Sequence, residues 1–273
     1  MPERALTDNH ILAALSEEEY QHLLSQAEQV SLRQQQILCS SGDPIKHLYF
    51  PLTAVFALVA TMKDGSTVEV GVIGSEGMVG ISAFWGVPVV PHQVVVLMPG
   101  EAIKMPAEAL KKALDHDGGH LHDLLLRYTH ALVAHISQTA ACNQLHKLDA
   151  RLARWLLVSH DRARSDEFPL TQEFIAQMMG IRRAGVTEAA GRLRQQGLLN
   201  YSRGHVAILD RQGLEAIACE CYEIVRQAFD YYLRSVTPHP ARQMALSVEQ
   251  FADRGSKVSE RIGTSLPSYR RKG

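Results

Sequence analysis

Ten arginines and six acidic residues lie between positions 151 and 211, so this part of a 273-residue chain of net charge -1 carries a charge of +4. Arginine pairs with phosphates and can donate two parallel hydrogen bonds to a guanine base edge. Phosphate neutralisation on DNA requires such a local excess of positive charge. The segment therefore has the chemistry of a nucleic-acid contact surface, provided that the fold presents its polar residues on one face.

Two short helices are predicted to present these residues. Apolar residues at helical spacing run from Phe174 to Met179, Thr171 can cap the start, and Gly180 suits the left-handed residue that ends a helix. After a short turn, a second periodic stretch has its apolar face at Val186, Ala190, Leu193 and Leu198. Two helices joined by a short turn predict a helix-turn-helix whose second helix enters a DNA major groove.

A β-hairpin is predicted directly after the second helix. Leu199–Tyr201 and Val206–Leu209 are strand-like runs, and Ser202-Arg203-Gly204 between them has turn chemistry, with Gly204 able to take a positive φ. The hairpin adds a wing with a basic tip. A further helical stretch, Leu214–Leu233, follows it.

The N-terminal half has a different period. Short runs rich in β-branched and aromatic residues are separated by turn sequences such as Gly42-Asp43-Pro44 and Lys63-Asp64-Gly65. The predicted strands are Ile37–Cys39, His47–Phe50, Val55–Thr61, Thr67–Ile73 and Val94–Met98. This pattern is typical of a jelly roll, which can enclose a ligand.

A long helix is predicted from about His120 to His146, with a length of about 40 Å. It carries one apolar stripe, which continues to Cys142 and in which Ile136 can replace His135; the predicted contact residues are Leu121, Leu125, Tyr128, Leu132, His135 and Thr139. A helix of this length between two domains is interpreted as a dimerisation helix, with a core helix as the alternative. The stripe is the predicted seam of a homodimer.

The fold class expected from these elements is α+β, with an N-terminal β jelly roll, a long dimerisation helix and a C-terminal winged helix-turn-helix. The predicted parts are an N-terminal helix in 1–30, an effector-type roll in 31–118, the dimerisation helix in 119–147, the winged helix-turn-helix in 148–236 and a flexible basic tail in 237–273. The tail has seven basic and three acidic residues and three prolines.

No run of 18 or more apolar residues occurs, and the first residues lack the apolar core of a signal peptide, so a cytoplasmic protein with no membrane partner is expected. Four cysteines do not make a disulfide framework in a chain this long. Cys219 and Cys221 have one residue between them, fewer than paired cysteines of structural zinc sites usually have. The thiols are interpreted as bystanders, and neither a metal nor a cofactor is predicted.

A roll with Gly42-Asp43-Pro44 and Leu48-Tyr49-Phe50, a long helix and a winged helix in this order resemble the Crp/Fnr family of bacterial transcription regulators, roughly over Asn9–Leu233. The resemblance implies a homodimer that binds a palindromic operator in double-stranded DNA. It further implies RNA polymerase as a partner and a small-molecule effector in the roll.

The effector pocket departs from the family pattern. Cyclic-nucleotide binders of the family hold the ribose with a Gly-Glu pair and the cyclic phosphate with an arginine, whereas here Met78 follows Gly77 and His92 lies near the arginine position. No arginine occurs between Arg33 and Arg127, and a phosphate buried without a cation would be an unpaired charge. The effector expected near Met78 and His92 is therefore an unknown small molecule rather than cyclic AMP or cyclic GMP; the alternative is a constitutive dimer that is controlled by its abundance.

The resemblance also implies roles within the helix-turn-helix. Arg183, Ala184 and Glu188 match positions that face base edges, and the residues matched to phosphate contacts are Thr171, Gln172, Arg182, Gly185 and Arg203. The family usually has Glu where Ala184 stands and Arg where Glu188 stands. Ala184 can touch a thymine methyl group and Glu188 can accept from cytosine N4, so the operator is expected to differ from the family's common half-site.

Two other function classes are weighed. A cupin-type metal-dependent enzyme with an accessory helical domain would need two histidines and a carboxylate from neighbouring strands, but the strand region has only His47 and His92, far apart in sequence. No catalytic residue is predicted. A protein-interaction adaptor that does not bind DNA is disfavoured by the ten arginines of the helix-turn-helix segment.

Overall fold

The computed structural model describes residues 8–236 except 16, 117, 118 and 164. Two helices, α1 (His10–Ala13) and α2 (Glu17–Leu24), occupy the segment predicted as one helix. Asn9 caps α1 by accepting from the amides of Ile11 and Leu12, and its amide group donates to carbonyls of Pro51 and Gly77. These polar contacts fix the start of α1 on the roll.

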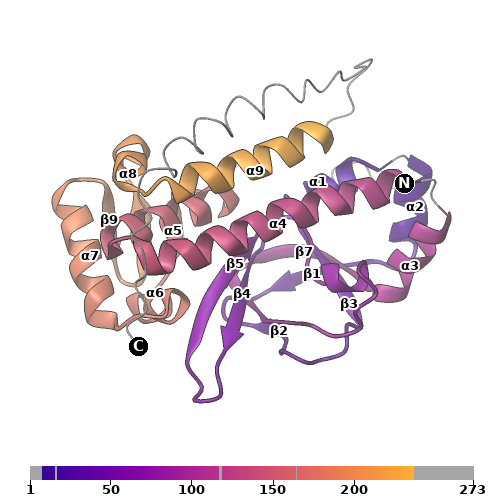
Figure 1. Ribbon diagram of the computed structural model, residues 1–273, viewed down its shortest axis with the longest axis horizontal. Coiled ribbons are helices and arrows are strands. Elements are labelled where there is room, and N and C mark those ends of the chain that lie inside the picture. Colours follow the sequence, from indigo (N-terminus) through magenta and orange to yellow (C-terminus); the bar gives the residue numbers. More distant parts are fainter. Residues whose placement is uncertain (1–7, 16, 117–118, 164, 237–273) are drawn as a thin grey trace, which may run out of the picture. The chain divides into compact units, whose positions relative to one another are not determined.

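Within the described residues, seven antiparallel strands form the roll, in sheets of order β1-β7-β3 and β2-β6-β4-β5; Figure 1 shows their arrangement. They are β1 (Glu28–Leu32), β2 (Ile37–Cys39), β3 (His47–Pro51), β4 (Val55–Thr61), β5 (Thr67–Ile73), β6 (Gln93–Met98) and β7 (Gly100–Pro106), with a short 3-10 helix at Ile81–Ala83. The five predicted strands are confirmed. The prediction missed β1 and β7, whose polar residues interrupt their apolar ones, and β1 begins before the predicted boundary at residue 31.

Strand β4 is buried on both faces. Phe56 and Leu58 belong to the core inside the roll, whereas Val55, Ala57 and Val59 belong to a second core that they share with the winged helix. Successive side chains of a strand point to opposite faces, so a continuous apolar run suits a sheet that is covered on both sides. The winged helix packs against the outer face of this sheet.

Helix α3 (Ala107–His116) is followed by the long helix α4 (His120–Leu145), which ends one residue before the predicted end. Helix α4 packs against β5 and against α9 (Cys221–Val236), the last helix of the described residues, which runs alongside it (Figure 1). Both contacts bury one side of α4 within the chain.

The winged helix begins with α5 (Leu148–Ala163) and contains α6 (Gln172–Met179), α7 (Arg183–Gln195) and α8 (Arg211–Ile217). Its small sheet has the order β8-β10-β9, with strands Glu167–Pro169 (β8), Leu199–Ser202 (β9) and His205–Ile208 (β10). The helical stretch predicted at Leu214–Leu233 is broken after Ile217, because Ala218 adopts an extended ψ of 148°. The break separates α8 from α9.

Among the described residues, no helix is both long and apolar enough to cross a membrane. The predicted basic tail, 237–273, lies outside the described residues.

Candidate nucleic-acid interface

The turn between α6 and α7 forms as its residue types predict. Thr171 Oγ1 accepts from the amide of Phe174 at 3.1 Å, and Gly180 closes α6 with a left-handed φ of 63°. Phe174, Ile175, Met178 and Met179 of α6 share one core with Val186, Ala189, Ala190 and Leu193 of α7. This packing turns the opposite face of α7 to solvent.

The exposed face of α7 starts with Arg182, Arg183 and Ala184 and continues to Glu188 one turn later. Arg183 Nε lies 4.0 Å from Glu173 Oε2, and both side chains are largely exposed, so this ion pair is loose. The Arg183 guanidinium therefore keeps its capacity for bidentate hydrogen bonding.

The other half of this surface comes from the start of α6 and from the wing. The Thr187 hydroxyl lies 2.7 Å from Gln172 Oε1, which ties α7 to the first turn of α6. Arg203 and Gly204 have φ values of 50° and 80°, the pair of left-handed residues that a two-residue hairpin turn requires. A Cβ on Gly204 would lie 3.3 Å from Thr171 Cγ2, so the wing tip lies beside the start of α6.

Gly185 differs from its neighbours. Its amide donates to the Arg182 carbonyl at 2.9 Å, and a Cβ on it would lie 3.1 Å from Leu148 Cδ2. The residue is partly exposed, the position of an added Cβ faces Leu148 of α5, and the amide already has a partner. Because glycine has no side chain, α7 can pack closely on α5 at this position. This placement does not support the predicted phosphate contact of Gly185.

Polar contacts fix the winged helix on the roll. Trp155 Nε1 donates to Glu69 Oε2 at 3.0 Å, and Arg162 Nε lies 2.7 Å from Glu76 Oε1 in a buried ion pair. Gln34 also donates to the carbonyl of Pro169. Burial raises the pKa of Glu69 to about 7, although Trp155, Arg154 and Arg162 oppose this change.

The six residues predicted for the dimer seam are all buried within one chain. They are Leu121, Leu125, Tyr128, Leu132, His135 and Thr139. The roll and α9 cover them: the rings of Tyr128 and Tyr232 lie 5.8 Å apart, and those of His135 and Phe229 lie 6.1 Å apart. In this conformation a second copy cannot reach these side chains, so the apolar stripe is core, as in the alternative interpretation.

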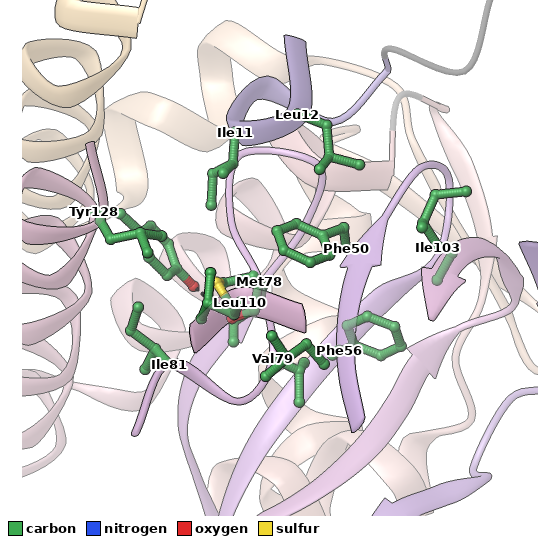
Figure 2. Close-up of a cluster of buried hydrophobic side chains, with 14 of the residues drawn as sticks. Ile11, Leu12, Phe50, Phe56, Met78, Val79, Ile81, Ile103, Leu110 and Tyr128 are labelled. Carbon is green, nitrogen blue, oxygen red and sulfur yellow. Dashed lines mark hydrogen bonds between the residues drawn. The ribbon is translucent and has the colours of Figure 1, made fainter. Parts of the chain in front are cut away.

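Met78 and His92, the two residues predicted near the effector, differ in their surroundings. Met78 is fully buried among apolar side chains, and the Tyr128 hydroxyl donates to its carbonyl at 3.1 Å (Figure 2). A Cβ on Gly77 would lie 2.5 Å from that hydroxyl, so α4 fills this part of the roll. His92 is half-buried, and burial lowers its pKa, which disfavours the cation that a phosphate would need.

Among the described residues, one group of side chains has donor atoms close enough together to hold a metal ion. It consists of Cys142, His146, Cys219 and Cys221. The Cys219-Glu220-Cys221 spacing by itself does not predict this group, because the other two ligands lie more than 70 residues away in the sequence. The detectable signal was Cys142 and His146, which are four residues apart at the end of a helix and so share a face.

Two family models match the chain: the cyclic nucleotide-binding domain over residues 29–117 and the Crp-like helix-turn-helix domain over residues 150–217. No curated protein matches it. Solved structures with the same fold include FixK2 of Bradyrhizobium japonicum, at 17% identity and a TM-score of 0.58, covering 71% of this chain and 98% of that one.

The regulator CLP of Xanthomonas campestris is similar at 16% identity and a TM-score of 0.57, covering 71% of this chain and 99% of its own. A CRP-family transcriptional regulator of Thermus thermophilus is similar at 20% identity and a TM-score of 0.58, covering 69% and 96%. The roll, the long helix and the winged helix thus combine as they do in these regulators. The chain belongs to the Crp/Fnr family of transcription regulators, with a cyclic nucleotide-binding-like domain and a helix-turn-helix DNA-binding domain.

Proposed function

We propose that the chain acts as a homodimer on palindromic operators in double-stranded DNA, with α7 in the major groove. The observation that carries the proposal is the surface on which the start of α7, the start of α6 and the wing tip come together. Arginines occur at the start of α7 and at the wing tip, and their side chains are exposed. The local excess of arginine gives this surface the charge that phosphate contact needs.

Within this surface we assign base contacts to three residues of α7. Arg183 donates to O6 and N7 of a guanine, Ala184 contacts a thymine methyl group, and Glu188 accepts from cytosine N4. Phosphate contacts are assigned to Thr171, Gln172, Arg182 and Arg203. Gly185 is left out because its amide already donates within the turn.

The dimer is assigned to the exposed side of α4. This side carries Leu126, His130, Val133, Ser137, Ala140 and Gln144. Their spacing alternates between four and three residues, which is the repeat of a two-helix coiled-coil seam. Leu126 and Val133 are 48% and 50% exposed in the single chain, so a second copy can bury them. RNA polymerase as a partner stays a prediction from the family resemblance.

The roll is proposed to respond to a signal other than cyclic AMP or cyclic GMP. Met78 stands where the family's ribose-binding glutamate stands, and it lies in the core under Tyr128. A nucleotide in this place would have to displace Tyr128 and bury a phosphate without an arginine partner.

The test compares Arg183→Ala with Arg203→Ala on an operator selected from random duplexes. We expect Arg183→Ala to cost about 1–3 kcal/mol on the operator and to relax the preference at one base position. Arg203→Ala should weaken binding to all sequences alike and reduce the dependence of affinity on salt. The readout is titration of labelled duplexes at several salt concentrations.

Arg226→Ala is the matched control, because Arg226 is an exposed arginine of α9 that pairs with Glu223 at 2.6 Å, away from this surface. It should bind like the unaltered protein. Equal losses on operator and random DNA for Arg183→Ala would contradict its assignment as a base reader.

A further inference from the structure

Four metal-ligating side chains meet where the winged helix joins the rest of the chain. They are Cys142, His146, Cys219 and Cys221, here called the Cys3His cluster. Cys142 lies in the last turn of α4, His146 directly follows α4, and the other two cysteines flank the break before α9. One donor atom from each lies within 4.8 Å of all the others.

The distances approach those of a tetrahedral zinc site. With Zn–S bonds of about 2.3 Å and Zn–N bonds of about 2.0–2.1 Å, neighbouring ligand atoms lie about 3.6–3.8 Å apart. Here Cys142 Sγ lies 3.4 Å from Cys219 Sγ, and Cys221 Sγ lies 3.4 Å from His146 Nδ1. Small side-chain movements are enough to place all four atoms around one ion.

Groups around the cluster support metal binding. His146 directs Nδ1 at the cluster, and its Nε2 lies 3.2 Å from Glu220 Oε1. A carboxylate on the second nitrogen is the usual orienting partner of a zinc-bound histidine. Gln138 Nε2 also donates to Cys221 Sγ at 3.1 Å, which stabilises a thiolate.

The charge balance is also favourable. Three thiolates, a neutral imidazole and Zn²⁺ have a net charge of -1. The guanidinium groups of Arg151 and Arg154 both interact electrostatically with Cys142. These cations compensate the charge of a loaded site.

We propose that the Cys3His cluster binds one Zn²⁺ ion in a closed structural site. Binding releases the thiol protons of the three cysteines to solvent, and four protein ligands leave no open position for chemistry on a substrate. Soft sulfur and nitrogen donors exclude Mg²⁺ and Ca²⁺, and three thiolates are fewer than an iron–sulfur cluster usually takes.

The site closes a long loop of the chain. Cys142 and Cys219 are 77 residues apart in sequence, and α5, α6, α7 and α8 all lie between them. The ion would therefore join the point where the chain enters the winged helix to the point where it leaves, and would hold the start of α9 against the end of α4. This inference does not depend on the proposed DNA contacts.

The first experiment measures metal content. The full chain is produced with added zinc, purified without chelators or metal-affinity resin, and analysed by inductively coupled plasma mass spectrometry. We expect about one zinc ion per chain, as a four-ligand site requires. Cys142→Ser and Cys219→Ser should lose it, whereas Cys39→Ser, which removes the cysteine outside the cluster, should keep it.

The second experiment uses the unaltered protein and so does not depend on variants that fold. Zinc is removed with a chelator under reducing conditions and Co²⁺ is added. We expect thiolate-to-cobalt charge-transfer bands and the intense ligand-field bands of tetrahedral cobalt, both bleached by Zn²⁺. Chelation should also lower the melting temperature, because the four ligands come together only in the folded chain, which therefore binds the ion more tightly than the unfolded chain does.

Three results would overturn the proposal. The first is protein without zinc that gives no cobalt bands. The second is metal content unchanged by Cys142→Ser and Cys219→Ser. The third is a disulfide between Cys142 and Cys219 in protein purified without oxidants, since those sulfurs need only close from 3.4 Å to about 2.05 Å.

Discussion

Glu69 is a carboxyl group held inside the contact between roll and winged helix. It is 4% exposed, it accepts from Trp155 Nε1, and burial raises its pKa from 4.5 to about 7. A folded-state pKa above the unfolded value means that the folded chain keeps a proton that the unfolded chain releases. The stability from this proton is complete below pH 4.5 and is lost as the pH rises through 7.

Glu69→Gln should remove this loss. Glutamine keeps an oxygen that can accept from Trp155 but does not ionise. The free energy of unfolding should therefore exceed that of the unaltered chain above neutral pH, by up to about 3 kcal/mol at 1.36 kcal/mol per pKa unit. Near pH 4.5 the two proteins should be alike.

Urea denaturation at acidic and alkaline pH measures this difference. Glu108→Gln is the control, because Glu108 is an exposed carboxyl of α3. If Glu69→Gln and the unaltered chain lose stability equally between the two pH values, Glu69 does not titrate as described.

At the scale of elements, α4 has two sides with apolar residues, and the two sides differ in how far they are buried. The buried side carries the predicted stripe, and the other side carries Leu126 and Val133, which are half-exposed. Helical periodicity detects the stronger stripe, and the sequence analysis predicts it to be the dimer contact. In the structure this stripe is buried within one chain. The weaker stripe is the one that the proposed homodimer would bury.

Val133→Asp should weaken the dimer without unfolding the chain. The side chain is 50% exposed, so a carboxylate there stays hydrated in the monomer but is buried across a helix pair. Sedimentation at micromolar concentration should show a shift toward monomer. Operator affinity should fall too, because half-sites one helical turn apart, about 34–36 Å, need two linked heads.

Ile224→Asp is the matched substitution, since Ile224 is an apolar residue of α9 that is 43% exposed. It should leave the dimer intact. A monomeric unaltered protein, or a Val133→Asp protein that dimerises as well as it, would contradict the seam on the exposed side of α4.

At the scale of the whole molecule, α4 connects the interior of the roll to the winged helix. Tyr128 fills the roll beside Met78, and further along the same helix His135 contacts Phe229 of α9. Arg162 of α5 pairs with Glu76 of the roll and lies 5.0 Å from the same Phe229 ring. Tyr128 and the contacts that hold the winged helix on the roll thus share the helices α4 and α9.

Cyclic AMP and cyclic GMP should not raise the melting temperature, even at millimolar concentration. A specific ligand at a hundred times its dissociation constant adds about 2.7 kcal/mol and raises the melting temperature by several degrees. A thermal-shift assay decides this, with the selected operator duplex as the positive control. A clear shift with either nucleotide would overturn the interpretation of Met78.

Local sequence determined most of the elements. Thr171 caps α6, Gly180 ends it, and Gly204 forms the hairpin turn. Each of these effects depends only on a few neighbouring residues, so the helix ends and the turn can be predicted without the rest of the chain. The five apolar strands and the length of α4 follow from periodicity in the same way. The apolar residues of α7 define its buried face, so its arginines on the opposite face are exposed.

Only the tertiary structure decided what each apolar face packs against. Periodicity shows that α4 has an apolar side, but it cannot tell whether α9 or a second copy covers it. The Cys3His cluster was hidden for a related reason. The break after Ile217 turns α9 back along α4, so Cys219 and Cys221 reach Cys142 and His146 although the whole winged helix lies between the two pairs in sequence.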